Sequence, residues 1–108
     1  MEYITYEEFS KLDIRIGKVI NAERIKGYKK IVKAKIDLGN EQRYLIVGGA
    51  EYYNPEDLVG KIIVVLANLQ PRTIAGIESQ GMLLAADVNG KPYWLTVDKE
   101  VPLGSKVK

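Results

Sequence analysis

The sequence contains no cysteine and no histidine among its 108 residues. The lack of cysteine excludes disulfides and thiolate nucleophiles, and the lack of histidine excludes imidazole acid–base catalysis. Zinc sites of the usual kind are built from the same two residue types. No apolar run approaches the roughly 18 residues of a transmembrane helix, and no signal-like segment opens the chain. We therefore expect a cytoplasmic protein with no active site, no cofactor and no membrane partner.

Length and charge narrow the class of protein further. A chain of 108 residues suits one modest core, so we expect a single domain over residues 1–108. Residues 11–46 carry ten Lys and Arg against four acidic residues, a net charge of +6, whereas the whole chain is only +2. One basic end and one acidic end indicate a polyanionic partner. The alternative interpretation is a solvated surface rich in Lys and Glu.

Alternating apolar residues and turn signals predict a small β-barrel. Thr5 and Glu8 form a capping-box pattern, which predicts a short helix over residues 6–11. In the strand that starts at residue 12, the alternation of apolar and polar residues shifts after Gly17. This shift predicts a bulge or bend where one strand serves two sheet edges. The remaining predicted elements are strands over 31–38, 43–47, 61–67, 82–88 and 92–97, a helix over 54–60, and a hairpin turn at Asn89-Gly90.

This order of elements predicts the fold. A bent first strand, and a short helix between the third and fourth strands, are typical of an all-β, five-stranded OB-fold barrel. We expect that barrel with short helices and a C-terminal extension, and an SH3-like barrel is the competing fold. OB-folds bind nucleic acid across strands 2 and 3 and the loops joining strands 1–2 and 4–5. In this sequence those loops are residues 25–30 and 68–81.

The first loop and the strand after it are basic. Lysines interleaved with an aromatic residue suit phosphate contact and base stacking, although lysine-rich turns are also common as solvated hairpins. The candidate RNA-binding residues here are Lys26, Tyr28, Lys29, Lys30, Lys33 and Lys35.

The second loop carries neutral polar groups and one guanidinium. Such groups can read the base edges of unpaired nucleotides, and the alternative for Asn68 is that it caps its own loop. Met82, at the start of a strand, is a residue type that usually packs inward. The candidate residues here are Asn68, Arg72, Ser79, Gln80 and Met82.

The same region resembles a known family, the tRNA-binding domain appended to methionyl-tRNA synthetases. The most specific motif is Asn68-Leu69 with Pro71-Arg72, followed by residues 76–86 (GIESQGMLLAA). The likeness extends over nearly the whole chain, through residues 11–19, 37–39, 53–61 and 101–105.

This resemblance implies a fold and a function. The family's domain is an OB-fold with a C-terminal extension, is commonly homodimeric, and binds tRNA by shape with little sequence preference. It thereby raises the affinity of an attached or associated synthetase for its substrate. The resemblance places the Ser79 and Met82 positions in the RNA site. It implies tRNA, a second copy of the chain and a methionyl-tRNA synthetase catalytic subunit as partners, with the chain acting as a β subunit or a C-terminal domain.

Departures from the family pattern leave a second function open. The family often has a characteristic stretch after its first strand, and residues 25–31 keep only its final lysine and an apolar residue. Two later positions that are often basic in the family are here Thr73 and Ala75. Residues 72–76 resemble instead the related CsaA-type export chaperone, a dimeric OB-fold protein that binds unfolded polypeptide. A polypeptide-binding chaperone is therefore the alternative function.

Residues 98–108 exceed what a five-stranded barrel needs. They contain Val101, Leu103 and Val107, while Pro102 and Gly104 interrupt regular structure. The segment either covers its own barrel or packs at a two-fold interface. By the resemblance we expect the interface, and so a dimerisation extension.

Overall fold

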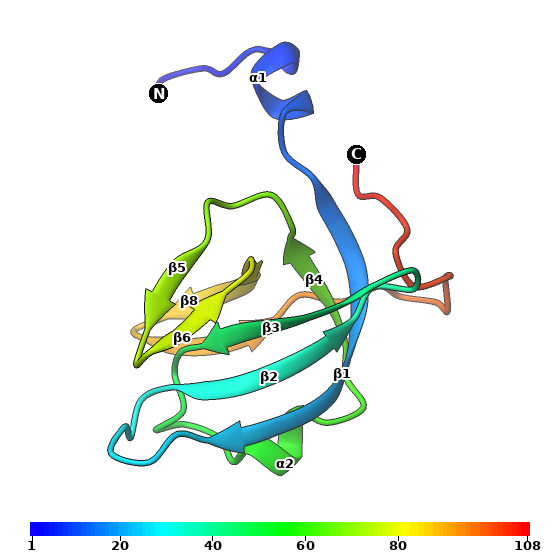
Figure 1. Cartoon of the computed structure of the whole chain (residues 1–108). Coiled ribbons are helices and arrows are strands. Elements are labelled where there is room, and N and C mark those ends of the chain that lie inside the picture. Colours follow the sequence, from blue (N-terminus) through cyan, green and yellow to red (C-terminus); the bar gives the residue numbers. More distant parts are fainter.

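The barrel is organised around one long strand, β1 (Ile14–Arg24), in a computed structural model that describes all of residues 1–108. The first part of β1 pairs with β4 (Ile62–Leu66), and the part from Lys18 onward pairs with β2 (Val32–Asp37) (Figure 1). The strand serves two neighbours, as predicted, but its bulge lies between Val19 and Asn21 rather than at Gly17. Gly17 is needed for packing, because a Cβ there would lie 2.9 Å from side-chain atoms of both Ile36 and Leu38.

The main sheet has the order β3-β2-β1-β4-β7 and curls into a nearly closed OB-like barrel, which confirms the predicted fold. β3 (Gln42–Val47) and β7 (Met82–Leu83) are its edges. The segment before β7 nearly joins them, because the N–H of Gln80 donates to the carbonyl of Tyr44 at 3.1 Å. The N–H of Ile46 donates to Ser79 Oγ at 3.0 Å, so a side chain supplies the next link of the closure.

Both short helices begin as the sequence indicates. α1 (Tyr6–Ser10) has the predicted capping box, with Thr5 Oγ1 accepting from the N–H of Glu8 and Glu8 Oε1 accepting from the N–H of Thr5, each at 3.1 Å. None of its residues is buried, and it projects away from the barrel (Figure 1). α2 (Pro55–Leu58) is shorter than the predicted 54–60 and packs Leu58 into the core. No helix in the chain is long and apolar enough to span a membrane.

The segment 68–81, predicted as a loop, contains a hairpin. β5 (Arg72–Ile74) and β6 (Ile77–Ser79) pair through a two-residue turn in which Ala75 and Gly76 have φ of 54° and 77°. Two consecutive residues with positive φ are typical of a type I′ turn, whose usual sequence signal is Asn-Gly or Asp-Gly. Alanine at the first position gives no such signal, so the sequence pattern does not predict this hairpin.

The predicted strand 82–88 is interrupted at Leu84. β7 pairs with β4, whereas β8 (Ala85–Val88) pairs with β9 (Lys91–Trp94) in a separate two-stranded sheet. The turn between them is the predicted Asn89-Gly90, and its φ values of 52° and 88° confirm the hairpin geometry. The last strand ends at Trp94, three residues before the predicted end.

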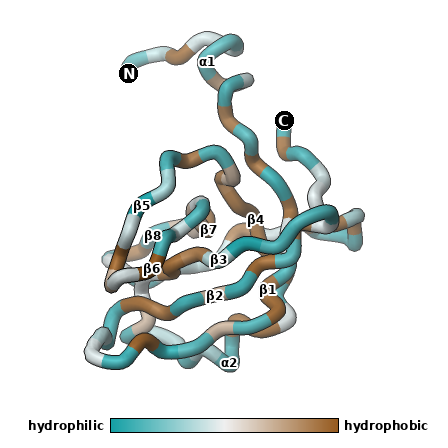
Figure 2. Tube along the Cα trace, in the orientation of Figure 1, coloured by the Kyte–Doolittle hydropathy of each residue, from teal (hydrophilic) through white to brown (hydrophobic).

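The core lies inside the barrel and follows the alternation read from the sequence. β2 directs Val32, Ala34 and Ile36 inward, and Leu38, just after the strand, is buried with them. β4 is hydrophobic along its length (Figure 2) and contributes Ile63 and Val65.

The C-terminal segment lies along the free edge of β1 in the same chain. The N–H of Ile16 donates to the carbonyl of Ser105 at 2.9 Å, and the N–H of Gly104 donates to the carbonyl of Ile16 at 2.7 Å. The N–H of Val107 donates to the carbonyl of Ile14 at 2.8 Å. The end of the segment, residues 104–107, therefore lies against its own barrel, and the role of residues 98–108 in dimerisation stays a prediction.

Candidate nucleic-acid interface

The outward face of β2 and β3 presents an aromatic ring between two lysines. Lys35 is directly opposite Tyr44 in the strand register, and the Nζ atoms of Lys33 and Lys35 lie 4.4 and 5.8 Å from the centre of the Tyr44 ring. Tyr44 is 40% exposed, so it is available to a ligand. Cations over an exposed ring form a surface for phosphate contact and base stacking.

Tyr44 is absent from the predicted site although the sequence holds a signal for it. Leu45 and Val47 alternate inward on the predicted strand, which directs Tyr44 and Ile46 outward. Pairing this strand with the lysines of the preceding one would have placed Tyr44 among them.

The basic turn between β1 and β2 is exposed and firmly anchored. All four candidate residues that lie in or beside it are exposed: Lys26, Tyr28, Lys29 and Lys30. The guanidinium of Arg24 donates to the carbonyls of Ala50 and Tyr53 at 3.1 and 3.2 Å, and to that of Lys29 at 3.5 Å. The N–H of Ala50 also donates to the carbonyl of Lys30 at 3.1 Å. The turn is therefore held in one position, which lowers the entropic cost of binding with its lysines.

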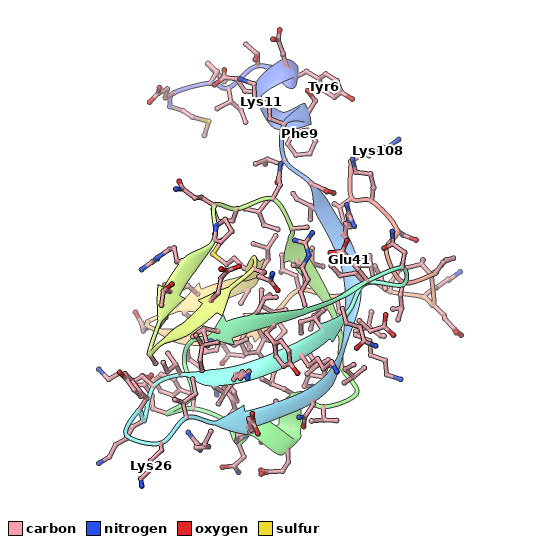
Figure 3. The ribbon with its side chains drawn as sticks, in the orientation of Figure 1. Tyr6, Phe9, Lys11, Lys26, Glu41 and Lys108 are labelled. Atoms are coloured by element: carbon pink, nitrogen blue, oxygen red, sulfur yellow. The ribbon has the colours of Figure 1, made fainter.

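No carboxylate lies within 4.0 Å of any lysine on this basic face, which we define as residues 26–35 with Tyr44. Glu23 is opposite Lys33 in the register of β1 and β2, yet it forms no ion pair with it at that distance. Figure 3 shows Lys26 at the tip of the turn, far from Lys108 and from Glu41, which lies at the other end of the β2–β3 hairpin. The positive charges of the face are thus free for an anionic ligand.

All four ion pairs of the chain lie at that other end. They form one cluster of Asp13, Arg15, Glu41, Arg43 and Lys106. The hydrogen bonds from Arg15 hold the pKa of the Asp13 carboxyl below its usual value, against the opposing effect of burial. This cluster ties the start of β1 to the β2–β3 turn and the C-terminal segment.

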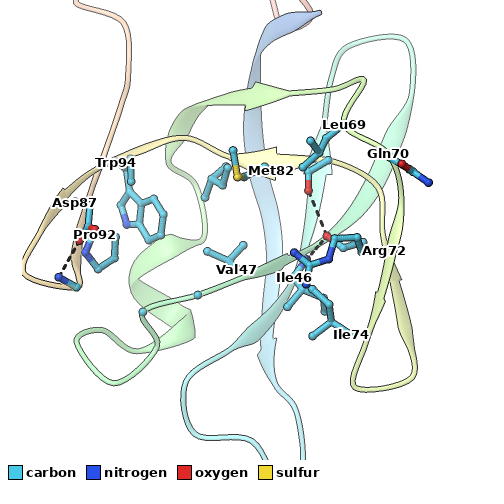
Figure 4. Close-up of a pocket in the computed structure, with 17 residues that line it drawn as sticks. Ile46, Val47, Leu69, Gln70, Arg72, Ile74, Met82, Asp87, Pro92 and Trp94 are labelled. Atoms are coloured by element: carbon cyan, nitrogen blue, oxygen red, sulfur yellow. Dashed lines mark hydrogen bonds between the residues drawn. The ribbon is translucent and has the colours of Figure 1, made fainter. Parts of the chain in front are cut away.

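A cavity of about 400 Å³ opens beside the basic face (Figure 4). Met82 lies in its middle, with Pro92 and Trp94 on one side and Leu69 and Arg72 on the other. Met82 is 44% exposed, so the alternative that it packs inward is wrong. Its neighbour Leu83 occupies the core instead, because successive side chains of a strand point to opposite faces.

Ser79 lines the same cavity but has a structural task. It is only 6% exposed, and its Oγ accepts from the N–H of Ile46 and donates to the carbonyl of Gly81 at 3.3 Å. It thus links β6 to the edge of β3 and fixes the wall from which Met82 projects. A direct contact between Ser79 and RNA stays a prediction.

Asn68 and Gln80 lie apart from Met82, in a polar groove near the start of β3. Asn68 Oδ1 accepts from the N–H of Asp13 at 2.8 Å, and its Nδ2 donates to the carbonyl of Lys11 at 2.6 Å. The amide of Asn68 therefore holds the distant segment that leads into β1, a structural role, and it does not cap its own loop. The Gln80 side chain is exposed, and its backbone carbonyl accepts from Arg43 at 3.3 Å.

Two further aromatic residues, Trp94 in the cavity lining and Tyr53 behind it, are also absent from the predicted site. Tyr53 and Trp94 pack edge to face with ring centres 5.5 Å apart, and the Tyr53 hydroxyl donates to the carbonyl of Gly48 at 2.7 Å. Burial raises the pKa of this hydroxyl far above its usual range, so it is neutral at physiological pH. No group of three or more acidic side chains is arranged to hold a metal ion.

Comparison with known sequences places these features in a family. Residues 14–106 match the family model described as "Putative tRNA binding domain". Methionine–tRNA ligase of Archaeoglobus fulgidus is 54% identical over 106 residues, which cover 98% of this chain and 16% of that protein. The corresponding ligase of Pyrococcus furiosus is 48% identical over 108 residues, which cover 100% of this chain and 15% of that protein. The chain thus spans about a sixth of the length of these curated relatives.

Solved structures match over the whole length. A MetRS-related protein from Pyrococcus horikoshii is 42% identical with a TM-score of 0.94, and the match covers 100% of both chains. The chaperone CsaA of Bacillus anthracis is 30% identical with a TM-score of 0.86, covering 99% of this chain and 100% of that one.

Proposed function

From the premise that the chain belongs to the tRNA-binding domain family, we propose that it is a cytoplasmic, non-catalytic module that binds tRNA with little sequence preference. The observation that carries the proposal is the basic face. Its lysines have no carboxylate within ion-pair distance, and they flank exposed Tyr28 and Tyr44. Lysines that contact phosphates bind RNA of any sequence, because the phosphate backbone is the same whatever the bases are.

The proposed task is to serve methionyl-tRNA synthetase. The relatives that are about 50% identical in sequence are methionine–tRNA ligases, and this chain matches a small part of each. As a β subunit or as a C-terminal domain, a module that holds tRNA by its backbone would raise the local concentration of substrate at a catalytic unit beside it. It would do so without contributing a reacting group.

We further propose that two copies associate through residues 98–108. Val101 and Leu103 are only half-buried and Val107 is exposed on the outside of the barrel, so apolar surface remains for a partner. A dimer would put two basic faces on one particle and strengthen a weak interaction with one RNA. Light scattering of the intact chain should give about twice 12.1 kDa.

The decisive experiment is a gel shift with total tRNA over a range of salt concentrations. We expect binding that weakens steeply as salt rises, since counterions released from RNA drive it. Absence of a complex at low salt, where association is most favoured, would refute the RNA-binding proposal.

The cavity beside Met82 supports a second candidate function, binding of unfolded polypeptide. Its lining includes Leu69, Ile74 and Met82, which can accept apolar side chains, and the CsaA structure aligns along the whole chain. Suppression of aggregation of an unfolded client, together with no tRNA complex, would favour this function over the first.

A further inference from the structure

A second hollow, which we name the aromatic groove, lies between α2 and the β8–β9 hairpin. It has a volume of about 490 Å³, and four aromatic side chains line it: Tyr52, Tyr53, Tyr93 and Trp94. Tyr52 and Tyr93 are each 50% exposed, whereas buried aromatic residues would serve the core alone. Half-exposed rings in a groove are suited to stacking with a planar ligand.

The rim of the aromatic groove is positively charged. Lys61 and Lys91 line it, and neither has a carboxylate within 4.0 Å. The Nζ of Lys91 lies 5.3 Å from the centre of the Tyr93 ring. The one carboxylate in the lining is Asp57, and its Oδ2 already accepts from the N–H of Asn54 at 3.1 Å. The lining therefore has two lysines without an ion pair and one carboxylate that is already hydrogen-bonded, a balance of charge that favours an anionic ligand.

The aromatic groove continues the surface proposed for tRNA. Pro92 and Trp94 line both this groove and the cavity beside Met82, so the two hollows share a wall. The segment that carries Tyr52 and Tyr53 is fastened to the basic turn through Arg24, which donates to the carbonyls of both Ala50 and Tyr53. The groove is therefore held in a fixed position relative to the basic face, so one flexible strand can reach both.

We propose that the aromatic groove binds single-stranded RNA, with unpaired bases stacked on Tyr52 and Tyr93 and phosphates near Lys61 and Lys91. The proposal rests on the proposed function for the source of the strand, which is an unpaired end of a tRNA held on the basic face. Stacking requires an open base, so the groove rejects duplex RNA, whereas the basic face binds phosphates of either form.

The chain contains its own reporter for this test, because Trp94 in the groove wall is the single tryptophan. We would titrate the intact protein with a short oligoadenylate and with a blunt RNA duplex, and follow the fluorescence of Trp94. The double variant Tyr52→Ala/Tyr93→Ala removes both stacking surfaces. Its matched control is Tyr3→Ala/Tyr6→Ala, which removes two exposed tyrosines of the N-terminal segment and α1, on the opposite side of the molecule from α2 (Figure 1).

We expect oligoadenylate to change the Trp94 signal and the blunt duplex to leave it unchanged. The affinity for oligoadenylate should fall roughly tenfold or more in the Tyr52/Tyr93 variant, and stay at the wild-type value in the control. If the Tyr52/Tyr93 variant unfolds, Lys61→Glu/Lys91→Glu tests the same groove through its charge and should lose affinity to a similar degree.

Equal oligoadenylate affinity in wild type and groove variants would overturn the proposal. So would a change in Trp94 fluorescence with an unfolded polypeptide but not with oligoadenylate. The gel shift with whole tRNA is read separately. A wild type that shifts tRNA while the groove variants keep full oligoadenylate affinity refutes the groove alone. A wild type that fails to shift tRNA, yet binds oligoadenylate through Tyr52 and Tyr93, refutes the proposed function alone.

Discussion

Gly39 and Gly104 meet backbone to backbone, each at φ of 90°. A Cβ on Gly39 would collide with the carbonyl of Leu103, and a Cβ on Gly104 would collide with the carbonyl of Leu38. The β2–β3 turn and the C-terminal segment can therefore lie this close only because both positions lack a side chain. This close approach fixes the segment beside β1, where its backbone hydrogen bonds form.

The first prediction concerns this pair of glycines. Gly39→Ala should lower the free energy of unfolding by more than the roughly 1–2 kcal/mol of left-handed strain, because it adds a clash with backbone atoms. Gly27→Ala is the matched control, since Gly27 has a similar φ of 87° but no atom within 4 Å of the added Cβ. Urea denaturation of both variants measures the difference. Equal destabilisation would show that the turn and the segment are not held together in solution.

The second prediction separates the roles of Ser79 and Met82. Ser79→Ala leaves the N–H of Ile46 without its acceptor and should cost roughly 1–3 kcal/mol of stability. Met82→Ala removes a half-exposed side chain and should change stability by less than about 0.5 kcal/mol, yet it should lower tRNA affinity. Thermal denaturation and gel shift on the same samples check both. A Met82→Ala variant with wild-type affinity would remove the cavity from the RNA site.

The third prediction concerns the basic face. Reversing Lys29, Lys30 and Lys33 to Glu should weaken binding to all tRNAs alike. It should also make the salt dependence less steep, by about 0.9 in slope for each phosphate that the variant no longer neutralises. The control variant reverses Lys11, Lys99 and Lys108 to Glu, which makes the same change of net charge at exposed positions elsewhere. The salt dependence of the gel shift distinguishes the two variants. The same weakening in both would mean that overall charge, and not the face, determines binding.

The fourth prediction concerns pH. Hydrogen bonds from Arg15 lower the pKa of Asp13 in the folded protein below its ordinary value of 3.8. The unfolded chain therefore binds the proton more readily, so the stabilisation from ionised Asp13 is complete above that pH. It is lost as pH falls through the lower folded value. The difference in free energy of unfolding between wild type and Asp13→Asn should shrink below about pH 3.8, as urea denaturation across pH would show. A constant difference would contradict this.

Much of the fold could be read from the sequence because its signals are local. The capping box at Thr5 and Glu8, the inward alternation of residues 31–38 and the Asn89-Gly90 turn each depend on neighbours within a few positions. The charge of the β1–β2 turn is likewise a property of one short segment. Such features form whenever the backbone conformation that the residues prefer is also the one the fold uses.

The tertiary structure alone decided which of these segments meet. Ser79 became a link of the barrel, Met82 pointed into a cavity, and Tyr44 came to lie between two lysines of another strand. The aromatic groove unites Tyr52 with Tyr93, which are far apart in the chain. Sequence periodicity determines which side chains face inward, because that depends on the pleat of a single strand. The partners of an outward side chain depend on how the barrel closes, and closure is set by packing and hydrogen bonds between residues distant in the chain.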